Sequence, residues 1–238
     1  MPIYDDVTVV EDLVFLQGIS ATKQTLRKWN ESPWKVIGVW AAWSLVVAIG
    51  LLGAVFAVAH YSQPDPTGIR IPGYYHPADV ADVGFILFRN SLVLALHGFA
   101  CVAGFIALNS LPYSAAQRSG ISRMVHEKAG PLAMLFVAGA TLFSLATQAY
   151  FIGGVLSTAA AQLGFSNLHL LVLLLPHALI ELTALFLPLA AWLVASRRGD
   201  WDQLLAATLV TVGIAVPALL LSVSLEVYLF PELIRLTQ

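Results

Sequence analysis

The sequence predicts an all-α, polytopic membrane protein with five transmembrane helices, a cytoplasmic amino terminus and an external carboxyl terminus. Of its 238 residues, 58% are hydrophobic and only 11% are charged, whereas about 25% of the residues in a soluble domain are charged. Five apolar segments are each long enough to cross a bilayer, and basic residues gather between alternate segments. Composition, segment length and charge asymmetry therefore favour the same class of fold.

Each predicted span covers the roughly 20 helical residues that a hydrocarbon core of about 30 Å requires. The spans are expected at residues 35–60, 85–112, 131–157, 168–196 and 204–229. A segment rich in Pro, Gly, Tyr and Asp, residues 61–84, is expected to form an ordered loop outside the membrane. The chain thus divides into an amino-terminal region, residues 1–33, and a transmembrane domain, residues 34–238.

The distribution of basic residues predicts the orientation of the spans. Nine of the 12 Lys and Arg residues lie on one side of the membrane if the chain crosses it five times. Cytoplasmic loops carry an excess of Lys and Arg, so this side is expected to face the cytoplasm. The first 30 residues are acidic and lack a continuous apolar segment, so no cleavable signal peptide is expected.

Residues 13–29 are expected to form an amphipathic helix on the cytoplasmic membrane surface, after an acidic tail. Trp29 and Trp34 are expected at the interface, because amphipathic aromatic rings favour that depth. Packing of this helix against another subunit is an alternative. The residues expected to bind cytoplasmic partners are these two tryptophans and three basic residues of the next cytoplasmic loop, Arg118, Arg123 and Lys128.

The fourth span carries polar residues that a purely lipid-facing helix would not have. Pro176 precedes His177 there, and Glu181 follows four residues after the histidine. Residues four apart share one face of a helix. A charged side chain at the centre of a membrane helix costs at least about 2.5 kcal/mol, so we expect Glu181 to have a partner or a function.

Polar residues of three other spans are predicted at a similar depth, in the external half of the bilayer. They are Arg89, Asn90 and His97 of span two, Gln148 of span three and Glu226 of span five. With Pro176, His177 and Glu181 they form the predicted intramembrane polar cluster. One interpretation is a substrate path that opens to the outside. The other is a buried network that sets the register of the helices, because polar side chains commonly join membrane helices.

Motifs for several activities are absent from the sequence. It contains neither the two-histidine pattern of zinc proteases nor a serine in a nucleophile elbow. It also lacks a Gly-rich phosphate loop, so any use of ATP requires a separate protein. We expect no metal and no cofactor. Nucleic acid is not expected as a partner either, because the net charge is −2.

Residues 176–182, Pro-His-Ala-Leu-Ile-Glu-Leu, resemble the most distinctive segment of the stage II sporulation protein M family of bacterial and archaeal integral membrane proteins. That segment is similar to Pro-His-Gly-x-x-Glu-Leu in a late span, and Ala178 here replaces the glycine. A second, less specific similarity is Phe-Arg-Asn-Ser at residues 88–91, followed by Gly98, Gly104 and Asn109. The resemblance covers residues 85–230.

The resemblance implies a non-enzymatic subunit of a larger assembly in the cytoplasmic (inner) membrane of a prokaryote. Family members are similar to permease subunits of the ABC-2 exporter type, which implies other membrane subunits and a cytoplasmic ATPase as partners, and a homo-oligomer is a further expectation. The alternative is a membrane scaffold for proteins that remodel the cell envelope. A third interpretation is an intramembrane hydrolase or metal enzyme built on His177 and Glu181.

The predicted orientation can be tested with topology reporters. A reporter that works only outside the cytoplasm should be active when fused after Gln238 and inactive when fused after Gly199, because five spans place these positions on opposite sides. A fusion after Gln238 that is active only with a cytoplasmic reporter would overturn the orientation.

Overall fold

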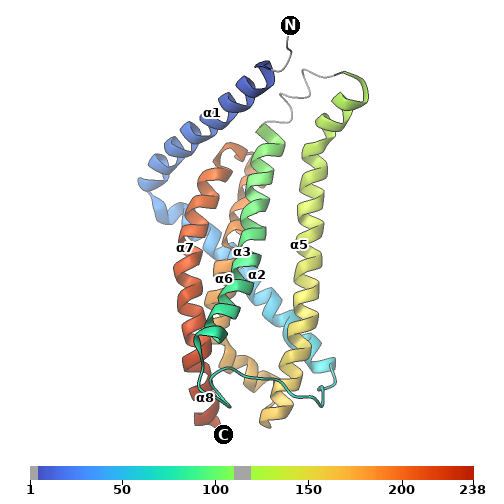
Figure 1. The fold of residues 1–238 in the computed structure, drawn as a ribbon, viewed down its shortest axis with the longest axis vertical. Coiled ribbons are helices and arrows are strands. Elements are labelled where there is room, and N and C mark those ends of the chain that lie inside the picture. Colours follow the sequence, from blue (N-terminus) through green and yellow to red (C-terminus); the bar gives the residue numbers. More distant parts are fainter. Residues whose placement is uncertain (1–4, 110–118) are drawn as a thin grey trace.

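The computed structural model describes the backbone of residues 5–109 and 119–238, and the side chains of residues 18–106, 119–120, 132 and 134–238. The described chain is helical (Figure 1). Its long helices are α1 (Asp5–Asn30), α2 (Pro33–Tyr61), α3 (Val80–Asn109), α5 (Gly120–Leu163), α6 (Asn167–Arg198) and α7 (Leu204–Ser224). A short 3₁₀ turn, η1 (Trp201–Gln203), precedes α7, and a π-helical turn, η2 (Leu225–Leu229), joins α7 to α8 (Phe230–Thr237).

Five helical segments of the described chain are long and apolar enough to cross a membrane, which confirms the predicted fold class. They are Pro33–Tyr61, Val80–Ile106, Met134–Leu163, Asn167–Arg198 and Trp201–Thr237. Helix α1 lies across one end of the bundle, here called the amino-terminal end (Figure 1). The loop of residues 62–79, helix α8 and the chain's carboxyl terminus lie at the opposite, carboxyl-terminal end.

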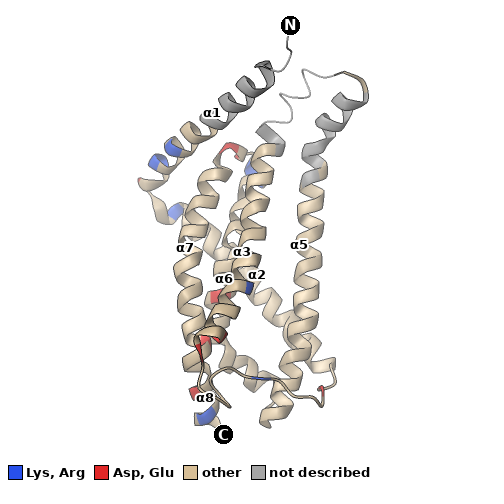
Figure 2. Ribbon diagram, in the orientation of Figure 1, with Lys and Arg blue, Asp and Glu red and all other residues tan. Residues whose placement is uncertain are grey.

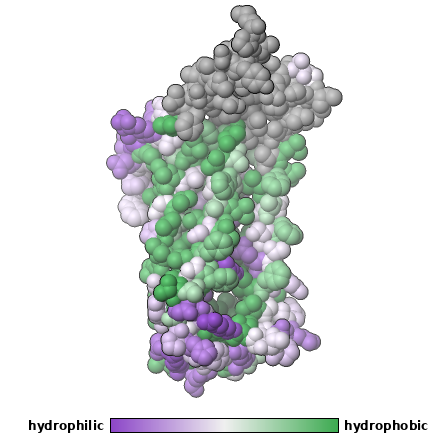
Figure 3. Space-filling model, in the orientation of Figure 1, coloured by the Kyte–Doolittle hydropathy of each residue, from purple (hydrophilic) through white to green (hydrophobic). Residues whose placement is uncertain are grey.

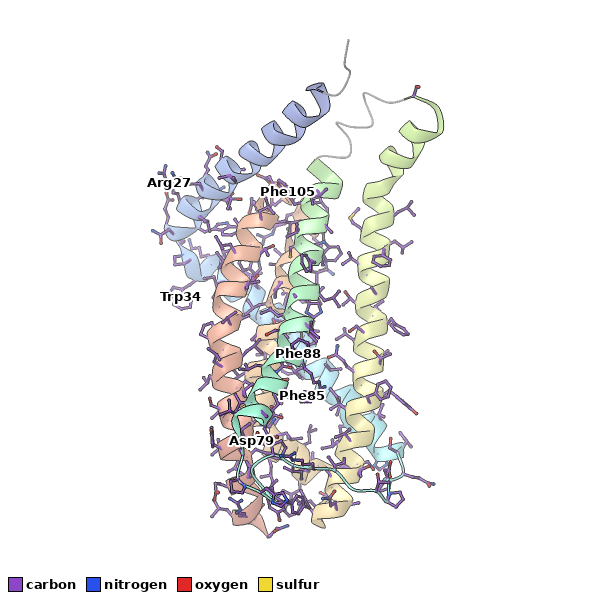
Figure 4. The ribbon with its side chains drawn as sticks, viewed as in Figure 1. Arg27, Trp34, Asp79, Phe85, Phe88 and Phe105 are labelled. Atoms are coloured by element: carbon purple, nitrogen blue, oxygen red, sulfur yellow. The ribbon has the colours of Figure 1, made fainter. Side chains whose placement is uncertain are left out.

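The second span starts earlier than its predicted start at residue 85, because two acidic residues cap the helix. The Asp79 carboxylate accepts a hydrogen bond from the Asp82 backbone N–H at 2.8 Å, and the Asp82 carboxylate accepts one from the Asp79 N–H at 3.2 Å. This reciprocal arrangement is a capping box. Asp79 and Asp82, which were predicted to lie in the loop of residues 61–84, therefore form the start of α3. The loop ends at Asp79 (Figure 4).

The last span also extends beyond its predicted end at residue 229. The chain continues without a break from α7 through η2 into α8. Pro231 lies in the first turn of α8 and has no N–H to donate to the preceding helical turn, which ends the regular α-helical pattern beside η2. Arg235 and Glu232, three residues apart on α8, form an ion pair at the exposed end of the bundle.

Helix α6 is the central element of the bundle and packs against α2, α3, α5, α7 and α8. Every residue from Ala184 to Trp192 is buried, so this part of α6 is enclosed on all sides. Such burial is typical of a core helix rather than a peripheral one. Both of its prolines, Pro176 and Pro188, lie inside a continuous helix.

Side chains of three neighbouring helices bind backbone carbonyl groups of α6. Ser44 of α2 donates to Thr183, and His97 of α3 donates through Nδ1 to Leu185 at 2.8 Å. These carbonyls flank that of Ala184, whose usual helical donor is missing because Pro188 has no N–H. Two further bonds run from Cys101 to the Pro188 carbonyl and from Ser222 of α7 to the His177 carbonyl.

Helix α1 contacts the amino-terminal end of the bundle through its described half. Gly18 lies so close to α3 and α7 that an added Cβ would be 3.1 Å from a ring carbon of Phe105 and 3.3 Å from a methyl group of Leu205. The ring of Trp29 packs edge-on against that of Trp40, with 5.1 Å between their centroids. One face of α1 is therefore held by the protein itself.

The close packing of α2 and α5 gives a direct test of the fold. A Cβ at Gly153 would lie 2.7 Å from the Cβ of Val58, whereas a Cβ at Gly154 would meet nothing within 4 Å. Gly153→Ala should lower the free energy of unfolding in detergent by about 1–3 kcal/mol, because overpacking forces the helices apart. Gly154→Ala is the matched control and should be neutral or stabilising. Equal thermal stability of the two variants would contradict the α2–α5 packing.

Candidate functional site

A cavity of about 370 Å³ lies in the carboxyl-terminal half of the bundle. Its walls are formed by α2, α3, α5 and α6, by loop residues 69–72, and by residues of η2 and α8. Most of the lining side chains are apolar. The polar and charged ones are Arg70, Arg89, Asn90, His177, Glu181 and Glu226.

Glu181 lies near the middle of α6 and is tied to α7 by a hydrogen bond. Its carboxylate oxygen Oε2 accepts from the Ser222 hydroxyl at 3.2 Å. Ser222 is fully buried, and its hydroxyl also lies 3.1 Å from the His177 carbonyl oxygen one turn away. The single hydroxyl proton of Ser222 is therefore shared between a backbone and a carboxylate acceptor on the same stretch of α6.

Glu226 reaches the cavity from the π-helical turn η2. Single π-helical turns are uncommon and occur often at functional sites, because the wider turn changes the direction of the side chains that follow. The Glu226 carboxylate lies close enough to the Glu181 carboxylate and to the Arg89 guanidinium for Coulomb forces to act between these groups. The cavity thus brings together two carboxylates from different spans.

Arg89 and Asn90 approach the carboxylates from α3. Arg89 is exposed, and its guanidinium lies 5.9 Å from the centre of the Phe85 ring. No ion pair within 4.0 Å joins it to a carboxylate in the described part of the chain. Asn90 is only 8% exposed, yet its amide nitrogen has no hydrogen-bond partner among the described residues. Buried amides are normally paired, and the Glu181 carboxylate lies close to the Asn90 side chain, so the amide is placed to bind either that carboxylate or a further group in the cavity.

His177 completes the polar lining. The side chain is buried, and its ring packs against that of Phe230 with 5.5 Å between the centroids. His177 and Glu181 both line the cavity, as their spacing of four residues on one helix predicts. Ala178, which follows His177 directly, lines the same cavity.

Three residues of the predicted polar cluster lie outside the cavity. His97 is buried nearer the amino-terminal end, where its ring binds the Leu185 carbonyl. Gln148 donates to the Ser144 hydroxyl of its own helix at 3.0 Å. Pro176 is on an exposed side of α6. Membrane depth predicted their grouping with Glu181, but the rotation of α5 and α6 directs Gln148 and Pro176 elsewhere, and His97 lies nearer the amino-terminal end.

The loop of residues 62–79 closes the carboxyl-terminal end of the cavity. Gln162 of α5 binds both the N–H and the carbonyl of Ile69, at 2.7 and 3.0 Å. Arg235 of α8 donates to the carbonyls of Gly73 and Tyr74, at 2.8 and 3.2 Å. Gly73 has a φ of +75°, and an added Cβ would lie 2.5 Å from the Val227 carbonyl, so only glycine fits this contact.

Polar contacts within the loop keep it ordered. The backbone N–H and the hydroxyl of Thr67 bind the Asp65 carboxylate, at 2.8 and 2.7 Å, and hold the pKa of that carboxyl below its usual range. Arg70 forms an ion pair with Asp82 at 3.2 Å. Sequence reasoning missed both Arg70 and Ser222 as residues of the site. Ser222 lies four residues before Glu226, a spacing that could have linked it to the cluster.

The cavity does not continue to the amino-terminal end. The buried stretch of α6 from Ala184 to Trp192 occupies the bundle beyond Glu181. Toward the side, cavity-lining residues are exposed between α3 and α5, among them Arg89, Phe151 and Val155. Figure 3 shows a hydrophilic patch that interrupts the hydrophobic surface on this face. Figure 2 shows charged residues within the bundle as well as at its ends.

The predicted partner-binding residues lie at the amino-terminal end. Trp34 is 82% exposed and points away from the bundle (Figure 4). Trp29 is half-buried and packs against Trp40, so most of its ring serves an internal contact. Arg118 lies outside the described residues, and only the backbone is described for Arg123 and Lys128 of α5.

The fold and the cavity together define a class: an all-helical protein with five membrane-compatible helices and a polar site in one half of the bundle. No protein-family model, curated protein or solved structure matches the chain. Within the part of the chain that the structure describes, no group of three or more His, Cys, Asp or Glu side chains is placed to hold a metal ion.

Thiol accessibility tests the cavity and its closed end. Ala178→Cys should react with N-ethylmaleimide because Ala178 lines the cavity. Two matched controls should not react: the native Cys101, which is fully buried, and Ala190→Cys, whose position is 3% exposed. Mass spectrometry of the intact protein counts the adducts. Labelling at Ala190→Cys as fast as at Ala178→Cys would show that the bundle is open through its whole length.

Proposed function

We propose that the protein is a non-enzymatic, permease-like subunit of a complex in the prokaryotic cytoplasmic membrane, and that its cavity binds a substrate. The observation that carries this proposal is the placement of Glu181 and Glu226 in one cavity within apolar helices. Charged residues at membrane depth commonly mark a substrate or ion pathway. The complex would include a separate ATPase, as in exporters of the ABC-2 type.

The arrangement of charges favours a binding site over a network that only sets helix register. A structural network in a low-dielectric interior is stable when its charges pair closely. Here Arg89 makes no ion pair within 4.0 Å with either glutamate, and the Asn90 amide nitrogen is unpaired among the described residues. Glu181 is held by Ser222 and lies close to Asn90, but the charged groups are not paired with each other and they line an open volume.

The closed amino-terminal half supports a permease-like mechanism. Transport by alternating access requires a site that is open to one side while the other side is sealed. The cavity is sealed toward the amino-terminal end, because buried α6 residues fill the bundle beyond Glu181, and its opening is at the side, between α3 and α5. Movement of α6 relative to α2, α3 and α7 would be needed to open the other side, and the side-chain bonds from Ser44, His97 and Ser222 resist that movement.

The resemblance to the stage II sporulation protein M family agrees with this proposal. The motif residues His177, Ala178 and Glu181 all line the cavity. The residues that carry the resemblance are therefore those that would contact a substrate. Exposed Trp34 and the basic residues at the amino-terminal end offer a surface for a cytoplasmic ATPase.

A membrane scaffold for cell-envelope remodelling proteins is the second candidate. Helix α5 supports it, because little of its most apolar stretch is buried and the helix exposes large apolar residues such as Phe136, Phe143 and Tyr150. Such residues can pack against a partner helix as well as against lipid. On this alternative the cavity would be secondary and the outer surface of α5 would carry the function.

Glu181→Gln separates the two candidates. In the complex purified from native membranes, the variant should assemble normally but lose transport-coupled ATPase stimulation by about tenfold or more, the factor that corresponds to ~1.4 kcal/mol of lost interaction. Glu31→Gln, at an exposed position outside the bundle, is the matched control. Full activity of Glu181→Gln would show that Glu181 is not on a substrate path. If a variant of the exposed α5 surface, such as Phe143→Ala, then released a partner, the scaffold would be favoured.

A further inference from the structure

The cavity has its exposed wall toward the bilayer rather than toward either end of the bundle. Loop residues 69–72 cover the carboxyl-terminal end, and buried residues of α6 fill the opposite end. The lining residues Phe151 and Val155 of α5 are 68% and 51% exposed, and Arg89 of α3 is exposed opposite them. A ligand from the bilayer can therefore reach the cavity between α3 and α5.

The inner surface of the cavity suits a hydrocarbon chain. Apolar side chains of α2, α5 and α6 form most of its wall, namely Leu51, Leu52, Val55, Leu156, Leu170, Leu171 and Leu174. Binding pockets bury most of a ligand in apolar surface and use a few polar groups to orient it. A small hydrophilic solute would leave this apolar surface wet, whereas an acyl chain would cover it.

The polar groups of the cavity divide by charge. Glu181 and Glu226 reach it from α6 and η2, and Arg89 lies at the exposed wall on α3. The other cation that lines the cavity, Arg70, is already paired with Asp82 at 3.2 Å. Two carboxylates and one available cation remain, so an ammonium group between the carboxylates would offset one of their two negative charges. Buried charges are stable when they are paired in this way.

Arg89 is placed for the second charge of a zwitterionic head group. An ammonium has three donors, which the two carboxylates can accept, while arginine binds phosphate oxygens well. The unpaired Asn90 amide nitrogen adds a donor beside Arg89. We therefore infer that the cavity binds an aminophospholipid, with its ammonium between Glu181 and Glu226 and its phosphate at Arg89. This inference rests on the proposed function, since it names the substrate class of the same site.

Lipid retention by the purified full chain tests the inference. The protein is reconstituted in nanodiscs with equal amounts of phosphatidylethanolamine and phosphatidylglycerol, then extracted in mild detergent and analysed by native mass spectrometry. Phosphatidylethanolamine should be retained at least about tenfold over phosphatidylglycerol, which has the phosphate but no ammonium. Equal retention of the two lipids would overturn the inference and leave only non-selective boundary lipid.

Matched variants locate the head group. Glu181→Gln and Glu226→Gln should each lower phosphatidylethanolamine retention about tenfold, and Arg89→Gln should lower it as well. Arg197→Gln is the control for arginine, because Arg197 also lies over an aromatic ring, that of Trp43 at 5.4 Å, but at the other end of the bundle. Retention that is unchanged in all three cavity variants would overturn the inference.

A competition experiment on the unaltered protein keeps the test independent of variant folding. A long-chain alkylamine should displace phosphatidylethanolamine, and the alcohol of equal chain length should not. Equal displacement by both would show that the ammonium is not recognised. If Glu181→Gln impairs ATPase stimulation without changing lipid retention, the proposed function stands and the lipid assignment fails. If Glu181→Gln loses selective lipid retention but keeps normal ATPase stimulation, the lipid assignment stands and the proposed function fails.

Discussion

The structure depends on the burial of α6 and on the side chains that bind its backbone. Ser44, His97 and Ser222, from three different helices, donate to carbonyl groups of this one helix. In a membrane, apolar side chains supply little force for association, because lipid is as apolar as leucine. Directional hydrogen bonds and close contacts, such as Gly153 against Val58, must therefore set the positions of the helices. They also fix the depth and direction of Glu181.

The cavity follows from the same constraint. Ser222 binds both the His177 carbonyl and the Glu181 carboxylate, so α7 holds the acidic side of the site against α6. The π-helical turn then brings Glu226 to the same volume. Helices α3 and α5 form the remaining walls without closing over the site. The result is an apolar cavity with its charged groups in one region and an exposed side wall. This arrangement suits the proposed lipid ligand.

The amino-acid pattern predicted several features at the level of single helices. The spacing of His177 and Glu181 placed both on one helix face, and both line the cavity. The predicted membrane depth also grouped Arg89, Asn90 and Glu226 with Glu181, and all of these residues line the cavity. Depth misled for Gln148 because it does not specify helix rotation, and His97 lies nearer the amino-terminal end than the cavity. Asp82 was predicted to lie in the loop because it is charged and belongs to a polar segment. In the structure it caps α3 instead.

The sequence by itself determined the class of fold, since long apolar segments must become helices where water cannot satisfy their backbone groups. It also determined which polar residues lie at membrane depth. Tertiary structure alone decided which of them share a cavity, that Ser222 and Arg70 join the site, and that loop residues 69–72 cover it. These features depend on helix rotation, on the π-helical turn and on contacts between residues far apart in the chain, such as Gln162 with Ile69 and Arg235 with Gly73. No local pattern encodes such pairings.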